Sequence, residues 1–149
     1  MKTNKSFINI LLAEDNPADV RLTQEAFKDG KISNNLYVVK DGIEAMAFLR
    51  KEDKYEKMPY PDLFLLDLNM PRMDGREVLK EVKSDPKLKQ IPIIILTTSE
   101  AESDVIKSYE LHANCYITKP VDFEKFITVV KQIEEFWFSI VRLPPQEGI

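Results

Sequence analysis

The sequence predicts an α/β protein with a doubly wound, five-stranded parallel sheet and five helices. Two observations support this class. Short, continuous apolar segments alternate five times with segments of helical periodicity, and turn or capping residues mark each change. The apolar segments show little polar alternation, which is typical of strands that are buried on both faces of a parallel sheet. Right-handed crossovers between such strands place helices on both faces of the sheet.

Each strand is followed by one helix. The strands are expected at residues 7–15, 34–40, 62–69, 91–98 and 114–118, and the helices at residues 16–30, 41–52, 75–85, 100–111 and from 122 onward. Asn16 and Pro17 suit a helix cap and first turn, and Gly30 suits a helix end. Asp41 and Glu44 have the spacing of a capping box. Residues 51–61 are polar and contain two prolines, so they predict a surface loop. The strand order 2-1-3-4-5 of flavodoxin-like sheets suits this pattern.

Length and composition predict one soluble cytoplasmic domain. With 149 residues, the chain suits a single domain over 1–149, with a folded core at 6–143 that ends in an extended helix and a short tail at 144–149. No secretory or membrane-spanning apolar segment is present, and the one cysteine, Cys115, excludes an internal disulfide and a Cys-based zinc site. The net charge of -4 argues against a nucleic-acid partner.

Polar side chains stand at four of the five strand ends, where a buried strand does not require them. They are Glu14 and Asp15, Asp67 and Asn69, Thr97, Thr98 and Ser99, and Thr118 and Lys119. If the first and third strands are neighbours, three carboxylates meet at the point where the strand order reverses. Such a cluster repels itself unless a cation neutralises it, and oxygen ligands without His or Cys favour Mg²⁺ over zinc.

The same strand ends offer the groups that phosphoryl transfer requires. Asp67 is the natural nucleophile, because a carboxylate can accept phosphate as an aspartyl phosphate. The ammonium of Lys119 and the hydroxyl of Thr97 would stabilise the charge of the phosphoryl group. Taken singly, each residue has a simpler interpretation as a helix cap, a strand residue or a surface lysine. Their gathering at one edge of one sheet favours a site.

These motifs resemble a known family. AED, LLDLNMPRMDG, LTTS and YITKP, in this order, resemble the receiver domain of two-component response regulators, and the likeness extends from about Phe7 into the last helix. HANCYITKP and the long loop before Pro61 are similar, in addition, to the small phytochrome response regulators of cyanobacteria.

The resemblance implies a role for each matching residue. It makes Asp67 the phosphoacceptor and Asp15 a direct Mg²⁺ ligand, with Glu14 acting through metal-bound water and Asn69 through its backbone carbonyl. It further implies a switch hydroxyl, a phosphoryl-binding cation, an aromatic residue that responds to phosphorylation, a proline after a cis peptide and two loop-shaping residues. These are Thr97, Lys119, Tyr116, Pro120, and the pair Pro71 and Gly75.

The last predicted helix carries more apolar surface than one core face needs. Phe136, Trp137 and Phe138 are adjacent, so they lie on several sides of the helix. A fold-back onto the domain would cover part of this surface, and an exposed patch of this kind marks an interface. We therefore expect a homodimer that uses this helix together with the fourth helix and the fifth strand.

The leading hypothesis is a stand-alone response regulator that accepts a phosphoryl group from a sensor histidine kinase, expected to be a phytochrome, and signals through protein contacts. It would be no enzyme beyond its own phosphorylation and dephosphorylation. One alternative is an aspartyl-phosphate phosphatase, but Asn69 stands where that class carries a second acid. Another is a flavin domain, which AEDNPAD disfavours because its acids would repel phosphate. A degenerate receiver acting as a scaffold is disfavoured by the intact acids. Asp74 is expected to be structural.

Overall fold

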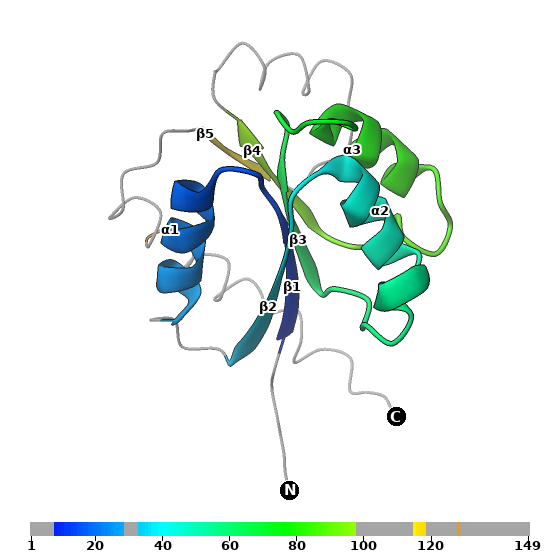
Figure 1. The fold of residues 1–149 in the computed structure, drawn as a ribbon, viewed down its shortest axis with the longest axis horizontal. Coiled ribbons are helices and arrows are strands. Elements are labelled where there is room, and N and C mark those ends of the chain that lie inside the picture. Colours follow the sequence, from blue (N-terminus) through cyan, green and yellow to red (C-terminus); the bar gives the residue numbers. More distant parts are fainter. Residues whose placement is uncertain (1–7, 29–32, 98–114, 119–127, 129–149) are drawn as a thin grey trace, which may run out of the picture.

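The computed structural model describes residues 8–28, 33–97, 115–118 and 128. Within them, five strands form one parallel sheet in the order β2-β1-β3-β4-β5 (Figure 1). The strands are β1 (Ile8–Ala13), β2 (Asn34–Val39), β3 (Leu63–Asp67), β4 (Ile93–Thr97) and β5 (Cys115–Thr118). The predicted α/β class with a parallel sheet is confirmed, and β1 and β3 are neighbours.

Helices cover both faces of the sheet (Figure 1). On one face lies α1 (Pro17–Lys28), and on the other lie α2 (Gly42–Leu49) and α3 (Gly75–Lys83). The helices expected at residues 100–111 and from 122 onward lie outside the described residues. Residues 51–61, which were predicted as a surface loop, are mostly exposed or partly buried and contain the 3-10 helix η1 (Asp53–Tyr55).

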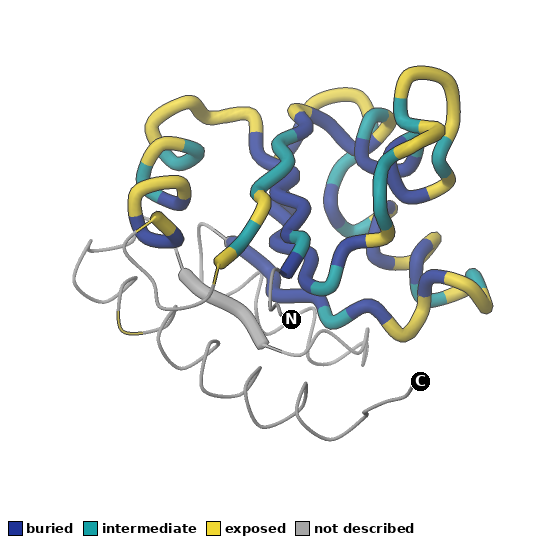
Figure 2. The backbone as a smooth tube through the Cα atoms, turned by 90° about the horizontal axis from the view of Figure 1, so that it is seen from below, coloured by how far each residue is buried: buried dark blue, intermediate teal, exposed yellow. Residues whose placement is uncertain are grey.

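The side chains of β1, β2, β3 and β4 alternate between two separate cores. Ile10 and Leu12 pack with the cluster under α1, whereas Leu11 and Ala13 pack with the cluster under α2 and α3. This alternation is the period of two that a strand imposes. Figure 2 shows the result, with mostly buried residues along β1, β3 and β4, mostly partly buried residues along β2, and exposed residues on the outer turns of α1 and in loops.

Local capping fixes where the helices begin. The Oδ1 of Asn16 accepts from the backbone N–H of Ala18 at 2.9 Å, as predicted for the start of α1. Asp74 precedes α3 and forms a full capping box with Glu77. The prediction that Asp74 is structural is therefore confirmed. Of the helices that the structure describes, none has the length and apolar character needed to cross a bilayer.

Candidate functional site

Three carboxylates meet at the carboxyl ends of β1 and β3. Glu14 and Asp15 follow β1 directly, and Asp67 is the last residue of β3. Their nearest ligand oxygens all lie within 4.8 Å of one another. Glu14 and Asp67 are 0% and 1% exposed, whereas Asp15 is exposed. The convergence follows from strand order, because β1 pairs with β3 in parallel up to Ala13 opposite Leu66.

Backbone hydrogen bonds hold the two buried acids in place. The N–H of Glu14 donates to the carbonyl of Val39 at the end of β2, at 3.0 Å. The N–H of Asn16 donates to Oε2 of Glu14 at 3.2 Å. The N–H of Asn69 donates to Oδ1 of Asp67 at 3.1 Å. The chain thus turns around each carboxylate and supplies a backbone donor two residues later.

The loop after Asp67, residues 68–74, returns closely to the strand that it leaves. The N–H of Gly75 donates to the carbonyl of Leu68 at 3.0 Å. A Cβ atom on Gly75 would lie 2.4 Å from the backbone oxygen of Asp67, so only glycine allows this approach. Gly75 therefore shapes this loop by close packing.

A second contact ties the same loop to the start of α2. The guanidinium of Arg72 contacts Oδ2 of Asp41 through Nε at 3.0 Å and through a terminal nitrogen at 2.9 Å. The N–H of Gly42 donates to the carbonyl of Met73 at 3.0 Å. The sequence does not signal this contact, because Arg72 lies 31 positions from Asp41. The predicted capping role of Asp41 is the one sequence signal that bears on the Arg72–Asp41 ion pair.

The capping box predicted at α2 forms only in part. Oδ1 of Asp41 accepts from the N–H of Glu44 at 2.8 Å, as expected. The carboxylate of Glu44 accepts instead from the hydroxyl of Tyr55 in η1. Burial, followed by this hydrogen bond and the charge of Glu44, raises the pKa of Tyr55 to about 12. A long-range partner has therefore replaced the local one.

The acidic cluster suits a hard divalent cation. Three carboxylates, two of them buried, concentrate negative charge where solvent screens it little. The cluster consists of Glu14, Asp15 and Asp67, so its side-chain ligands are all oxygen, as Mg²⁺ and Mn²⁺ prefer. The residues present therefore fit such an ion.

Some of the remaining predicted residues lie within the described part of the chain, and the others lie outside it. Thr97 ends β4 and is opposite Thr118 of β5, so both stand at the same sheet edge as Asp67. Tyr116 lies within β5. Pro71 lies in the loop after Asp67. The described residues do not include Lys119, Pro120, Phe136, Trp137 and Phe138.

Fold and site together define an α/β domain with an acidic cluster that suits a divalent cation at the switch point of its sheet. Residues 10–131 match the response regulator receiver domain. The chain therefore belongs to the response regulator receiver family.

Individual relatives agree with this assignment. The chain is 53% identical over 135 residues to the response regulator Rcp1 of Synechocystis sp., covering 91% of this chain and 92% of that protein. The structure of a phosphorylated cyanobacterial phytochrome response regulator, RcpA, is 52% identical with a TM-score of 0.80, covering 90% of this chain and 96% of that one. The Mn²⁺-bound form of Rcp1 is 52% identical with a TM-score of 0.79, covering 92% and 99%.

Proposed function

We propose that this protein is a response regulator whose Asp67 accepts a phosphoryl group from a sensor histidine kinase of the phytochrome type. The observation that carries the proposal is the meeting of Glu14, Asp15 and Asp67 at the ends of neighbouring strands. The likeness to phytochrome response regulators supports the choice of donor. Phosphorylation would change protein contacts, because it adds charge that an ordered surface must accommodate.

Phosphoryl transfer to Asp67 requires little covalent chemistry from the protein. A carboxylate oxygen of Asp67 attacks phosphorus, an O–P bond forms, and the bond from phosphorus to the donor histidine nitrogen breaks. That nitrogen keeps the electron pair. The contribution of the chain is positioning, since β3 is buried and the N–H of Asn69 orients one oxygen of Asp67. Thr97 and Lys119 are proposed to bind the phosphoryl oxygens, and Tyr116 to respond to them.

The proposed cofactor is Mg²⁺. Glu14, Asp15, Asp67 and the backbone carbonyl of Asn69 would hold it, with Glu14 acting through water. When bound, such an ion neutralises charge on carboxylate and phosphoryl oxygens. The finding that supports it is the all-oxygen cluster, together with the Mn²⁺-bound form of the relative Rcp1.

The finer architecture is part of the same proposal. We propose that one receiver domain spans the chain, with a folded core at 6–143, five strand-helix units and a short tail at 144–149. Pro120 is proposed to follow a cis peptide. Phe136, Trp137 and Phe138 are proposed to form a homodimer interface, which light scattering with and without phosphorylation would test. A monomer at tens of micromolar in both states would contradict the dimer.

The phosphatase and scaffold alternatives are less well supported. A phosphatase of the aspartyl-phosphate class needs an acid two residues after the nucleophile to move a proton, and Asn69 cannot do this. Burying two acids costs free energy, and a scaffold that is never phosphorylated would not require the two buried acids, Glu14 and Asp67, that backbone donors hold here.

The test is phosphorylation by acetyl phosphate in the presence of Mg²⁺. We expect an acid-stable, base-labile phosphoryl group on the parent protein, and no label on Asp67→Asn. The control is Asp74→Asn, which keeps a capping side chain at α3 and should label normally. Calorimetric titration with Mg²⁺ gives a readout that is independent of labelling, and Asp15→Asn should weaken this binding. Equal labelling of Asp67→Asn and the parent would refute the proposal.

A further inference from the structure

The carboxylate of Asp41 serves two partners at once. The Asp41 side chain is 11% exposed, and its two oxygens have separate roles. Oδ1 caps α2 by accepting from Glu44 N–H, and Oδ2 accepts from two nitrogens of Arg72. A helix cap alone would need only one of these oxygens, and a neutral Asn would provide it. The second oxygen binds the loop after Asp67.

Arg72 has an unusual backbone for its residue type. Its φ is 68°, in the left-handed region that residues other than Gly, Asn and Asp rarely adopt. A residue holds such a conformation when its surroundings impose it. The two bonds to Asp41, together with the bond from Gly42 N–H to the carbonyl of Met73, supply that constraint.

The loop held in this way is the one that folds over Asp67. The N–H of Gly75 bonds to the carbonyl of Leu68, which joins the two ends of the loop, and within the loop Arg72 and Met73 bond to the start of α2. Asn69 lies between these ties, and its N–H donates to Oδ1 of Asp67. The position of the Asn69 backbone relative to the acidic cluster therefore depends on the contacts that Asp41 and Gly42 make at the start of α2.

We propose that Asp41 and Arg72 are a positioning pair that sets the cation affinity of the acidic cluster and the phosphorylation rate of Asp67. The pair acts by fixing loop 68–74. This inference rests on the proposed function of the site. It adds a regulatory element, since any partner or modification that draws Arg72 away from Asp41 would loosen the loop. The side chain of Arg72 is 59% exposed and so is accessible to such a partner.

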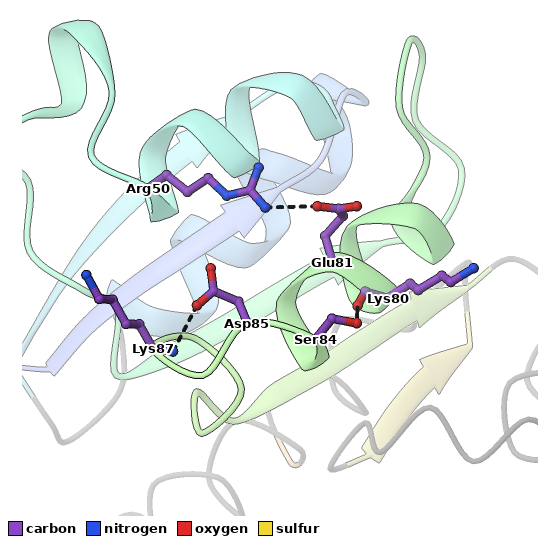
Figure 3. A network of polar contacts seen from close by, with 6 residues as sticks. All are labelled: Arg50, Lys80, Glu81, Ser84, Asp85 and Lys87. Carbon is purple, nitrogen blue, oxygen red and sulfur yellow. Dashed lines mark hydrogen bonds and ion pairs between the residues drawn. The ribbon is translucent and has the colours of Figure 1, made fainter.

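An ion pair elsewhere on α2 provides a matched control. Arg50 follows the last residue of α2, and its guanidinium contacts Glu81 of α3 at 2.8 Å (Figure 3). This pair also joins α2 to the segment after β3. It lies at the C-terminal end of α2, whereas Asp41 and the carboxyl ends of the strands lie at the N-terminal end. If any ion pair between these elements affected the site through general stability, Arg50→Gln would act like the other variants.

Four variants separate positioning from a simple charge effect. They are Asp41→Asn, Arg72→Gln, the double variant and Arg50→Gln. Asp41→Asn keeps the cap while it removes the charge, so α2 remains capped. A long-range charge effect would give the single variants opposite signs, because removing an acid weakens cation binding and removing a base strengthens it. Positioning instead predicts that both weaken it, and that the double variant resembles each single variant because the pair acts as a unit.

The measurements are Mg²⁺ affinity by calorimetry, the initial rate of phosphorylation by acetyl phosphate, and backbone hydrogen exchange in loop 68–75 without cation. We expect about threefold to tenfold weaker Mg²⁺ binding in both single variants and the double, slower phosphorylation, and faster exchange at Asn69 and Gly75. Arg50→Gln should match the parent in all three. Opposite signs, parent-like values in the single variants, or an equal loss in Arg50→Gln would overturn the inference. A parent that neither binds Mg²⁺ nor labels at Asp67 would overturn the proposed function, while the exchange measurement would still decide whether the pair holds the loop.

Discussion

Gly75→Ala should disturb both stability and phosphorylation, through one added methyl group. The Cβ would lie 2.4 Å from the backbone oxygen of Asp67 and 2.7 Å from the Cα of Leu68. The first distance is about 1 Å closer than an ordinary contact, where repulsion rises steeply. Both neighbours are backbone atoms, so no side-chain rotation relieves the overlap. No positive φ is involved, so backbone strain of that kind adds nothing.

Two opposing effects set the size of the change. Alanine favours a helix over glycine by about 1 kcal/mol, and less at a first helical position such as this one. Overpacking against a fixed backbone costs about 1–3 kcal/mol. The steric cost therefore dominates, and we expect a net destabilisation of about 1–2 kcal/mol. A shift of the loop by about 1 Å would also misplace the groups around Asp67, so we expect phosphorylation at least about tenfold slower.

Urea denaturation and acetyl phosphate labelling test both parts. Lys80→Ala is the control, because it introduces the same residue at an exposed position of the same helix and should leave both quantities near the parent values. The labelling is compared at a urea-free condition where both proteins are folded. A folded Gly75→Ala that has the parent's free energy of unfolding and the parent's labelling rate would refute the steric reasoning.

Three further predictions concern electrostatics and packing. Glu44→Gln should lower the pKa of Tyr55 from about 12 toward 10.0, though burial keeps part of the shift, and phenolate absorbance measures it. Because this pKa is raised, the contribution of Tyr55 to stability is present below pH 10 and is lost as pH rises through about 12. Burial raises the pKa of Asp62, so its contribution to stability is present below 3.8 and is lost as pH rises through the raised value. Asp62→Asn, which can still accept from Asn9 N–H, should therefore gain free energy of unfolding relative to the parent as pH rises from 3.8. Phe64→Ala empties a fully buried position between the strands and α2, and it should cost about 3–5 kcal/mol by urea denaturation.

Each of these predictions has a contradicting result. A Tyr55 titration that is unchanged in Glu44→Gln would show that the carboxylate does not hold the phenol proton. A constant difference in stability between Asp62→Asn and the parent across the acid range would contradict burial of the Asp62 charge. A loss below about 1 kcal/mol in Phe64→Ala would mean that the core collapses to fill the space.

Much of the site was predictable because its signals are local. An apolar strand that ends in acidic residues can be recognised in the sequence whatever the strand packs against. The carboxyl ends of parallel strands lie at the same edge of the sheet. Glu14, Asp15 and Asp67 were therefore expected together, and the structure brings their oxygens within 4.8 Å. Asn16 and Asp74 follow the same logic, because a cap bonds to residues two or three positions ahead.

Contacts between distant segments were not predictable in this way. The capping residue Asp41 has a second partner, Arg72, only because β2 and the loop after β3 end on the same edge of the folded sheet. The carboxylate of Glu44 accepts a hydrogen bond from the Tyr55 hydroxyl instead of completing the capping box with Asp41. This is possible because the loop after α2 folds back against that helix.

The sequence by itself determined the fold class, the starts of α1, α2 and α3, and the acids at the switch point, since periodicity and capping act over a few residues. Only the tertiary structure decided how the loop after Asp67 is held. That depends on the bond between Arg72 and Asp41 and on the space that Gly75 leaves beside β3, and neither exists until strands distant in the sequence pair side by side.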